Sequence, residues 1–190
     1  MDKIKSTIEK SIAVKQAVLS DTELQSRVAQ AAELMISSLK SDGKILFCGN
    51  GGSAADAQHL SCELSGRFYL DRPALYAEAL HVNTSALTAI GNDFDFSEIY
   101  ARQLEGMGKK GDVLFALSTS GNSENIIKAI KQGKKLGMVI IGFTGASGGA
   151  MKDLIDVLIN IPSTDTPRIQ ESHIMLGHAI CEIVEAKMFA

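Results

Sequence analysis

The sequence predicts an α/β protein of three layers, in which a doubly wound, parallel five-stranded sheet lies between two layers of helices and two N-terminal helices precede it. Short apolar runs alternate with segments of helical periodicity along most of the chain, as in a parallel sheet with crossover helices. The runs are apolar throughout rather than at every second residue, which is expected of strands buried on both faces. Loops rich in glycine and serine follow two of these runs.

The composition is ordinary for a globular protein and excludes several classes of function. The chain has 190 residues, of which 45% are hydrophobic and 22% charged, and we expect one domain over residues 1–190. A net charge of −3 argues against binding mainly to the backbone of nucleic acids. No apolar run approaches the ~20 residues that cross a bilayer, and the N-terminus lacks the apolar core of a signal peptide. We therefore expect a cytoplasmic protein that binds neither nucleic acid nor membrane.

Residues 1–42 precede the sheet and contain two helical segments. The break between them falls near Ser20 and Asp21, which can cap the second segment. That segment, residues 22–39, carries apolar side chains at helical spacing. Two amphipathic helices ahead of an α/β core either pack on its sheet or pair with another subunit, and we favour a role in oligomerisation.

The central stretch, residues 44–68, combines a strand, a glycine-rich loop and a helix. The apolar run at 45–48 predicts a buried strand. The loop at 49–52, Gly-Asn-Gly-Gly, breaks that strand and requires a positive φ angle at one or more positions. Ser53 is the expected N-cap of a helix over residues 54–68.

The same helix carries four polar side chains on one face. Asp56, His59, Glu63 and Arg67 follow one another at spacings of three, four and four residues. The N-terminus of this helix favours an anion, because its unpaired N–H groups and the positive end of its dipole converge there. A phosphate-binding loop followed by a histidine and a carboxylate indicates an active site.

The remaining elements continue the alternation of strands and helices. An extended segment is expected at 74–80, strands at 112–117, 138–143 and 157–161, helices at 83–90, 96–107, 124–136 and 167–188, and a short helix after the glycine-rich turn that follows residue 143.

Two loops are candidates for phosphate binding, because ligands of open parallel sheets bind beyond the carboxyl ends of the strands. One is the glycine-rich loop already described. The other, residues 118–123, has the sequence Ser-Thr-Ser-Gly-Asn-Ser and places four hydroxyls at the start of a helix. Neither loop has the P-loop pattern or the spacing of the dinucleotide-binding fingerprint. The alternative interpretation of the second loop is an ordinary serine-rich helix start.

The last helix supplies further candidates, Gln170, His173 and His178. Helical geometry allows only one of these two histidines to join Gln170 readily at a shared site. His178 lies among apolar residues, so it is either a hydrogen-bonded core histidine or a site residue. His59 and Glu63 are either a surface pair or two zinc ligands. If these two meet His178, a zinc site with an oxygen from Gln170 becomes available, and the same groups suit aldose–ketose isomerisation.

Four motifs resemble the phosphoheptose isomerase family of sugar isomerase (SIS) domain proteins. They are CGNGGSAADAQHLSCELSGRF, LTAIGNDF, LSTSGNSENIIKAI and RIQESHIMLGHAICEIVE. The resemblance implies an SIS fold with a flavodoxin-like strand order and a homotetramer whose active sites lie between subunits. It implies the conversion of sedoheptulose 7-phosphate to D-glycero-D-manno-heptose 7-phosphate, the first step toward ADP-heptose and the heptose of bacterial lipopolysaccharide.

The resemblance also implies roles for individual residues. Glu63 and His178 match the acid–base pair. The zinc ligands that it implies, for one Zn²⁺ per subunit, are His59, Glu63, Gln170 and His178. The substrate contacts that it implies are Asn50, Gly51, Gly52, Ser53, Arg67, Asn92, Asp93, Ser118, Thr119, Ser120, Ser123, Thr166 and Gln170.

Glu63 receives two roles that compete, since a zinc-bound carboxylate is a weaker base than a desolvated free one. Either the substrate displaces or loosens Glu63 from the metal, or zinc is structural or inhibitory.

Two other classes of function are alternatives to the enzyme. One is a non-catalytic relative that binds the replication initiator, and the other is a sugar-phosphate sensor. Both need the loops but not the pair of Glu63 and His178, which this sequence contains.

Overall fold

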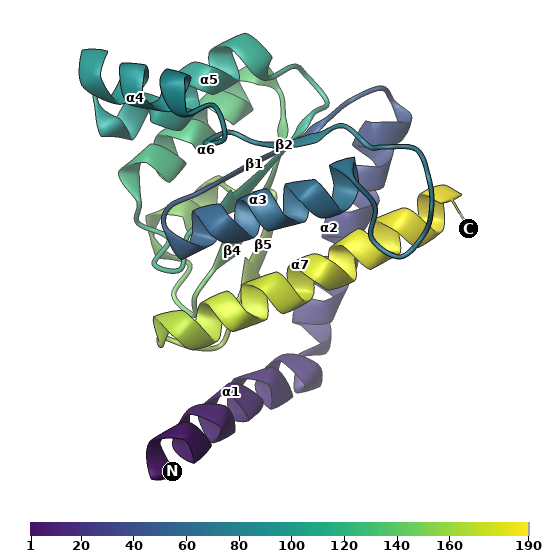
Figure 1. Ribbon diagram of the computed structural model, residues 1–190, viewed down its shortest axis with the longest axis vertical. Coiled ribbons are helices and arrows are strands. Elements are labelled where there is room, and N and C mark those ends of the chain that lie inside the picture. Colours follow the sequence, from purple (N-terminus) through teal and green to yellow (C-terminus); the bar gives the residue numbers. More distant parts are fainter. Residues whose placement is uncertain (190) are drawn as a thin grey trace.

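The computed structural model describes residues 1–189, and Figure 1 shows the arrangement of its elements. The helices are α1 (Asp2–Ser20), α2 (Thr22–Lys40), α3 (Gly52–Ser65), α4 (Thr84–Asp93), α5 (Ile99–Met107), α6 (Glu124–Leu136) and α7 (Thr166–Phe189). The strands are β1 (Ile45–Gly49), β2 (Ala77–Ala79), β3 (Val113–Leu117), β4 (Val139–Thr144) and β5 (Val157–Asn160). Two short 3-10 helices are η1 (Phe96–Glu98) and η2 (Gly149–Leu154).

The five strands form one parallel sheet in the order β2-β1-β3-β4-β5. This confirms the predicted doubly wound sheet and its flavodoxin-like strand order. β1 lies beside β3 although β2 comes between them in the sequence. The chain therefore winds toward one edge of the sheet after β1 and toward the other edge after β3. In folds of this kind the loops after two such strands border a crevice at the carboxyl edge, where ligands bind. Here a pocket of about 300 Å³ lies between Asn50, which follows β1, and residues 123–125 at the start of α6.

Helices cover both faces of the sheet, because the strands are apolar on both sides. On one face, Phe47, Phe115 and Phe143 pack with the apolar sides of α2, α3 and α7. On the other face, Leu46 and Leu114 pack with α5 and α6. Figure 1 shows α3 and α7 side by side, with α4, α5 and α6 gathered in the other layer. The three predicted layers are therefore confirmed.

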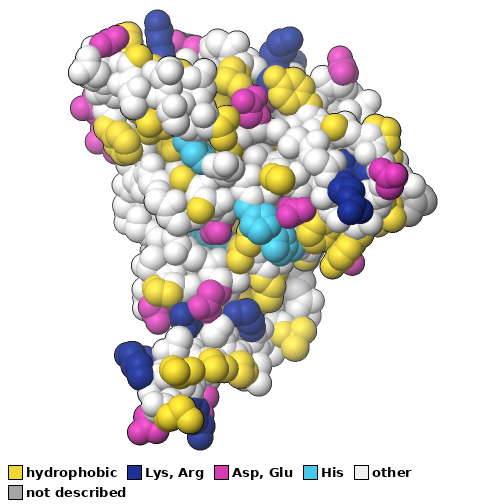
Figure 2. All heavy atoms as spheres, in the orientation of Figure 1, with side chains coloured by type: hydrophobic (Ala, Val, Ile, Leu, Met, Phe, Trp, Pro, Cys, Tyr) yellow, Lys and Arg dark blue, Asp and Glu magenta, His cyan; other side chains and the backbone are white. Residues whose placement is uncertain are grey.

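The two N-terminal helices differ in how much of their apolar surface is buried. α2 begins as predicted at Asp21, whose carboxylate accepts a hydrogen bond from the Leu24 N–H at 2.9 Å, and it packs on the sheet. α1 extends away from the body of the chain (Figure 1). Ile4, Ile8 and Ile12 are 64%, 52% and 49% exposed and lie four residues apart, so they form an apolar row along α1 (Figure 2). α1 is thus an amphipathic helix whose apolar side faces outward in the single chain.

α3 begins two residues earlier than the sequence predicts. Its N-cap is Gly51, whose φ of 55° confirms the expected positive φ in the glycine-rich loop. Ser53 lies within the first turn, so the prediction that Ser53 caps the helix is wrong. A residue with a positive φ can turn the chain directly into the helix, and this leaves the Ser53 side chain buried inside the turn.

α3 also ends earlier than predicted, at Ser65 rather than Phe68. Gly66 follows with φ −92° and ψ −111°, outside the helical region. Arg67 therefore does not continue the helical face that Asp56, His59 and Glu63 share, and its predicted place on that face is wrong. Helical periodicity alone cannot locate this boundary, because the apolar spacing continues past it.

Two other predicted helices form in a modified way. The segment expected at 96–107 begins as η1 and continues as α5, and the short helix after β4 is the 3-10 helix η2. The Asp95 carboxylate starts η1 by accepting a hydrogen bond from the Ser97 N–H at 2.7 Å. Within residues 1–189, no helix has the length and apolar character required to cross a membrane.

A buried ion pair joins β1 and β3 at the amino edge of the sheet, opposite the crevice. The Asp112 carboxylate accepts from Lys44 Nζ at 2.6 Å and from the backbone N–H groups of Lys44 at 3.0 Å and Lys109 at 2.8 Å. We expect Asp112→Ala to lower the free energy of unfolding by about 3–5 kcal/mol, because it leaves the Lys44 ammonium buried and unpaired. Urea unfolding at a fixed protein concentration measures this change.

The matched control is Asp153→Ala, which removes an exposed aspartate from η2. Surface substitutions of this kind change the free energy of unfolding by about 0.5 kcal/mol or less. If Asp112→Ala costs no more than this control, the buried pair does not stabilise the fold.

Candidate active site

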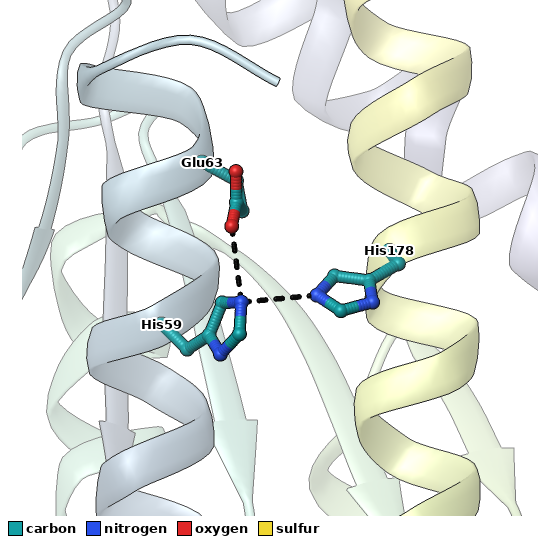
Figure 3. Close-up of side chains that lie close together, drawn as sticks. All are labelled: His59, Glu63 and His178. Atoms are coloured by element: carbon teal, nitrogen blue, oxygen red, sulfur yellow. Dashed lines mark hydrogen bonds and ion pairs between the residues drawn. The ribbon is translucent and has the colours of Figure 1, made fainter. Parts of the chain in front are cut away.

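His59, Glu63 and His178 converge between α3 and α7 (Figure 3). His59 Nε2 lies 3.0 Å from Glu63 Oε1 and 3.1 Å from His178 Nε2. The first two residues come from successive turns of α3, while His178 reaches across from α7. Histidine atoms are visible at the surface near the middle of the molecule in Figure 2. The structure therefore confirms the predicted meeting of these three side chains.

A glycine allows the two helices to approach closely enough for this contact. A Cβ atom at Gly177 would lie 2.6 Å from both terminal methyl carbons of Leu60, which is closer than side-chain packing permits. Gly177 directly precedes His178, and Leu60 directly follows His59. This close contact between α3 and α7 is therefore adjacent in sequence to both histidines of the cluster.

The chemistry and spacing of the cluster fit a zinc ion. Imidazole nitrogen and carboxylate oxygen are common zinc ligands, and the three donor atoms all lie within 4.8 Å of one another. Bonds of about 2.0–2.1 Å in tetrahedral geometry place neighbouring ligand atoms roughly 3.3–3.4 Å apart, close to the distances found here. The two facing Nε2 atoms can share only one proton, so a lone pair is directed into the cluster.

Two further side chains lie around the cluster. The ring of Phe68 packs against His178, with centroids 5.6 Å apart. Asp56 lies one turn before His59 on α3. Burial raises the pKa of Asp56 to about 6, although the nearby His59 opposes this shift. Within the described chain, the buried Oδ2 atom of Asp56 has no hydrogen-bond partner. A carboxyl group that titrates near neutral pH therefore lies beside the cluster.

A reciprocal pair of amide hydrogen bonds joins the two loops that flank the crevice. Asn50 Nδ2 donates to Asn125 Oδ1, and Asn125 Nδ2 donates to Asn50 Oδ1, both at 2.8 Å. Asn50 directly follows β1, and Asn125 lies in the first turn of α6. The pair therefore sets the distance between the N-termini of α3 and α6, the two predicted anion sites. It also occupies the amide of Asn50, which the resemblance assigns to the substrate.

The serine-rich loop after β3 holds its hydroxyls in an ordered turn. The buried Ser118 Oγ accepts a hydrogen bond from the Gly121 N–H at 3.2 Å and lies 3.2 Å from Ser123 Oγ. Ser120 Oγ accepts from the Asn122 N–H at 3.2 Å. Ser123 stands at the N-cap position of α6, yet its hydroxyl does not cap that helix. The hydroxyls of this loop therefore bond within the loop rather than to the start of α6, and phosphate binding there stays a prediction.

A pocket of about 270 Å³ opens between the loops after β3, β4 and β5. Hydroxyl groups of Thr119, Ser120, Ser147, Ser163 and Thr166 are among those that line it. Thr166 begins α7, so this pocket connects the serine-rich loop with the helix that carries His178. The predicted substrate residues after β3 and at the start of α7 are thus brought together.

Gln170 and His173 take different directions from α7. The Gln170 amide rests on Gly52 at the start of α3, where a Cβ atom would lie 2.5 Å from Gln170 Nε2. His173 is fully buried and its Nε2 lies 3.0 Å from the Thr144 carbonyl oxygen. Burial lowers the pKa of His173 to about 4, so it is a neutral core histidine. Of the two histidines that the sequence left open, His178 is therefore the one at the cluster.

Three predicted substrate residues lie apart from the cluster within residues 1–189. Arg67 is exposed in the segment that follows α3. Asn92 and Asp93 form the exposed C-terminal end of α4, where Asn92 Nδ2 donates to Asp93 Oδ1 at 2.8 Å. α4 packs on the opposite face of the sheet from α7. A single chain therefore does not bring this pair to His178.

Sequence reasoning missed Asn125 and Phe68. Asn125 directly follows the serine-rich motif and Glu124, and an amide in the first turn of a helix at the crevice was the available signal. Phe68 is the last residue of the helix that the sequence predicts over residues 54–68. Its contact with His178 depends on where α3 ends, for which the sequence carries only the signal of Gly66.

The predicted anion-binding loops lie at the carboxyl edge of the sheet, and the cluster lies further along α3. Ser53 lies in the first turn of α3, and His59 follows at a distance of about 9 Å along the axis, at ~1.5 Å per residue. This span is of the same order as an extended sugar phosphate. The arrangement can therefore hold a phosphate at the helix N-termini while a carboxylate and an imidazole act on the far end of the same molecule.

Known proteins share this fold and sequence. Residues 9–145 match the SIS domain family. A phosphoheptose isomerase from Aneurinibacillus thermoaerophilus is 52% identical and aligns with 99% of this chain and 95% of its own length. The solved structure of a phosphoheptose isomerase from Neisseria gonorrhoeae is 45% identical, with a TM-score of 0.92, over 97% of this chain and 98% of that one. One from Francisella tularensis is 39% identical, with a TM-score of 0.94, over 97% of each chain. The chain therefore belongs to the SIS domain family and, within it, to the phosphoheptose isomerases.

Proposed function

We propose that this protein converts sedoheptulose 7-phosphate to D-glycero-D-manno-heptose 7-phosphate. The observation that carries this proposal is the convergence of Glu63 and His178 in a member of this family. In cells, we propose that the reaction takes place in the cytoplasm and supplies the heptose of ADP-heptose and lipopolysaccharide. The similarity to phosphoheptose isomerases supports the reaction class, and the geometry of the cluster supports its residues.

The proposed reaction moves hydrogen between C1 and C2 of the sugar. Glu63 removes a proton from C1 of the ketose, and His178 donates a proton to the carbonyl oxygen on C2, which gives a 1,2-enediol. Glu63 then returns a proton to C2, while the hydroxyl on C1 loses its proton to His178 and becomes the aldehyde. No atom or electron is gained or lost overall, so the pair is regenerated after each turnover.

The two loops at the crevice hold the phosphate and the hydroxyls of the sugar in this proposal. Ser118, Ser120 and Ser123 offer hydroxyls beside the N–H groups at the start of α6. Gly52 offers its N–H group at the start of α3, whereas the Ser53 N–H already donates to the Asn50 carbonyl oxygen at 3.0 Å. Backbone N–H groups, hydroxyls and helix dipoles bind phosphate without a lysine.

We further propose that His59, Glu63 and His178 hold one Zn²⁺ per chain. The resemblance implies Gln170 as a fourth ligand, for which its amide would have to leave Gly52, about 10 Å along α3 from His59. When bound, the zinc would supply Lewis-acid polarisation of the substrate carbonyl. Glu63 would then be both ligand and base, so either the substrate would loosen its contact with the metal or the zinc would be structural or inhibitory. The side chain of Glu63 is 21% exposed and that of His59 is 48% exposed, so Glu63 is the better shielded of the two.

The apolar row on α1 supports a homotetramer with active sites between subunits. Ile4, Ile8 and Ile12 expose a row of large apolar side chains that a second copy can cover. Asn92 and Asp93 lie away from the cluster of their own chain. In an assembly, a neighbouring copy can supply them to the site, as the resemblance requires. We therefore assign residues 1–42 to oligomerisation as well as to packing on the domain.

Glu63→Gln tests the assigned base. We expect turnover to fall by about 10²–10⁴-fold, because the amide cannot accept the proton from C1. Affinity for phosphate is expected to persist, since the loops are unchanged. An NMR time course of sedoheptulose 7-phosphate in D₂O follows the appearance of aldose signals, and deuterium at C2 reports an enediol that exchanges with solvent.

The matched control is Glu182→Gln, an exposed glutamate on α7, which is expected to turn over at the rate of the unchanged protein. Near-normal turnover by Glu63→Gln would remove Glu63 from the mechanism. No conversion by the unchanged protein, with or without zinc, would favour a protein that binds the replication initiator or senses a sugar phosphate.

His59→Ala tests the metal site. Because this variant removes the donor atom that lies between the other two, we expect zinc per chain, measured by elemental analysis, to fall from about one toward zero. His81→Ala, at a histidine outside the cluster, is the control and is expected to retain zinc. If the protein is fully active after chelation and free of zinc, the metal is dispensable for the reaction.

Ile8→Glu tests the assembly. A buried, unpaired carboxylate at an apolar contact is costly, so we expect the mass measured by light scattering to fall below that of four chains. Lys10→Glu is the control, because residue 10 lies on the opposite side of α1 from Ile8. A tetramer that persists in Ile8→Glu would mean that the apolar row of α1 is not the contact surface.

A further inference from the structure

A buried carboxylate holds residues 66–72, the segment that connects α3 to the chain before β2. The Glu185 carboxylate accepts hydrogen bonds from the backbone N–H groups of Phe68 at 3.0 Å, Tyr69 at 2.7 Å and Leu70 at 2.9 Å. Three consecutive N–H groups directed at one anion form a concave anion site of the kind that usually binds phosphate. Here the protein fills it with its own side chain.

Arg72 completes this contact and closes the end of α3. Its Nε donates to Glu185 Oε1 at 2.8 Å, while its Nη1 and Nη2 donate to the carbonyl oxygens of Leu64 and Glu63, both at 2.8 Å. Carbonyls in the last turn of a helix have no partner within it, so the guanidinium acts as a cap. The side chains of Arg72 and Glu185 are 1% and 2% exposed, so neither can touch a bound sugar.

The pair is ionised at neutral pH. Burial by itself would raise the pKa of Glu185, but the N–H groups of Leu70, Phe68 and Tyr69 and the Arg72 guanidinium outweigh burial and hold it at about 2. Every donor that faces the carboxylate therefore meets a full negative charge, which makes these hydrogen bonds stronger than neutral ones.

Glu185 and Arg72, which together we call the clamp, are connected to both proposed acid–base residues. The backbone carbonyl of Glu63 accepts a hydrogen bond from Arg72, and the ring of Phe68 packs at a tilt against His178. Glu185 follows His178 by seven residues on α7, close to two full turns, so both point to the same side of that helix. One buried pair thus fixes the end of α3 and the ring that packs against His178.

We propose that Glu185 and Arg72 are positioning residues for the isomerisation, holding Phe68 and the last turn of α3 so that Glu63 and His178 keep their mutual geometry. The inference rests on the proposed function, in which those two residues exchange protons with the sugar. If the clamp is merely structural, breaking it changes only stability and the folded fraction. If it positions the acid–base residues, breaking it also lowers kcat of the folded protein.

Glu185→Gln tests the proposal with little change of shape. Each carboxylate oxygen accepts two of the four hydrogen bonds, so an amide nitrogen in place of either oxygen loses two of these bonds. We expect kcat of the folded protein to fall at least about tenfold, as for small displacements of reacting groups, with KM changed less than about threefold. Hydrogen exchange of the amides of residues 68–70 is expected to accelerate in the same variant.

Two controls separate positioning from stability. Asp112→Ala breaks the buried ion pair at the amino edge of the sheet, so it lowers stability without touching the clamp. Glu182→Gln removes an exposed glutamate from α7. Both are expected to keep kcat within about twofold of the unchanged protein once the folded fraction is measured. If Glu185→Gln shows the same kcat as these controls, the clamp is structural only and the proposal is wrong.

Phe68→Leu keeps the proposal testable if Glu185→Gln does not fold. This variant keeps the backbone N–H on Glu185 and removes the ring from His178, so kcat is expected to fall while the amides of residues 68–70 stay protected. An unchanged kcat in this variant would overturn the proposal.

The ring proton resonances of His178 distinguish failure of the clamp from failure of the proposed function. If the unchanged protein does not isomerise the sugar, the proposed function fails. The proposed clamp can still be tested, because these resonances are expected to shift in Glu185→Gln through the loss of the Phe68 ring current. Unshifted resonances would overturn the clamp whatever the reaction is.

Discussion

The close packing of α3 against α7 is the contact on which the candidate site depends. Leu60 fills the space that a side chain at position 177 would need, so the helices approach to a distance at which His59 and His178 touch. His59 and Glu63 are neighbours on α3 through helical spacing alone, whereas His178 is 119 residues away from His59 in the sequence. A larger residue than glycine at position 177 would separate the two helices before it altered any proposed ligand.

The reversal of winding direction between β1 and β3 determines where a substrate can bind. Parallel strands end at the same edge, and the chain leaves these two in opposite directions, so the loops that follow them border an open crevice. The amides of Asn50 and Asn125 pair across that crevice and keep two helix N-termini at a set distance. The proposed phosphate binding and acid–base chemistry both depend on this constraint, because α3 has its N-terminus at the crevice and carries the cluster further along its length.

Buried charges are placed at both ends of this framework. Lys44 and Asp112 pair at the amino edge of the sheet, away from the crevice, while Arg72 and Glu185 pair beside the last turn of α3. Removing two charges from water is costly, and a well-packed apolar pair often stabilises a fold as much. The second pair also satisfies three backbone N–H groups and two helix carbonyls. The pair of Arg72 and Glu185 therefore acts mainly on the conformation of residues 66–72, rather than on the stability of the whole fold.

The sequence by itself determined the elements whose signals are local. The apolar runs and helical spacings predicted the parallel sheet, and the glycine- and serine-rich loops marked its carboxyl edge. The spacing of His59 and Glu63 likewise predicted a shared face, because side-chain periodicity within one helix needs no knowledge of its neighbours. Tertiary structure decided the rest. It placed His178 rather than His173 at the cluster, joined Asn50 to Asn125, and ended α3 before Arg67. Each of these depends on contacts between segments far apart in the chain, and such contacts are set by the packing of whole helices and strands, which no local pattern encodes.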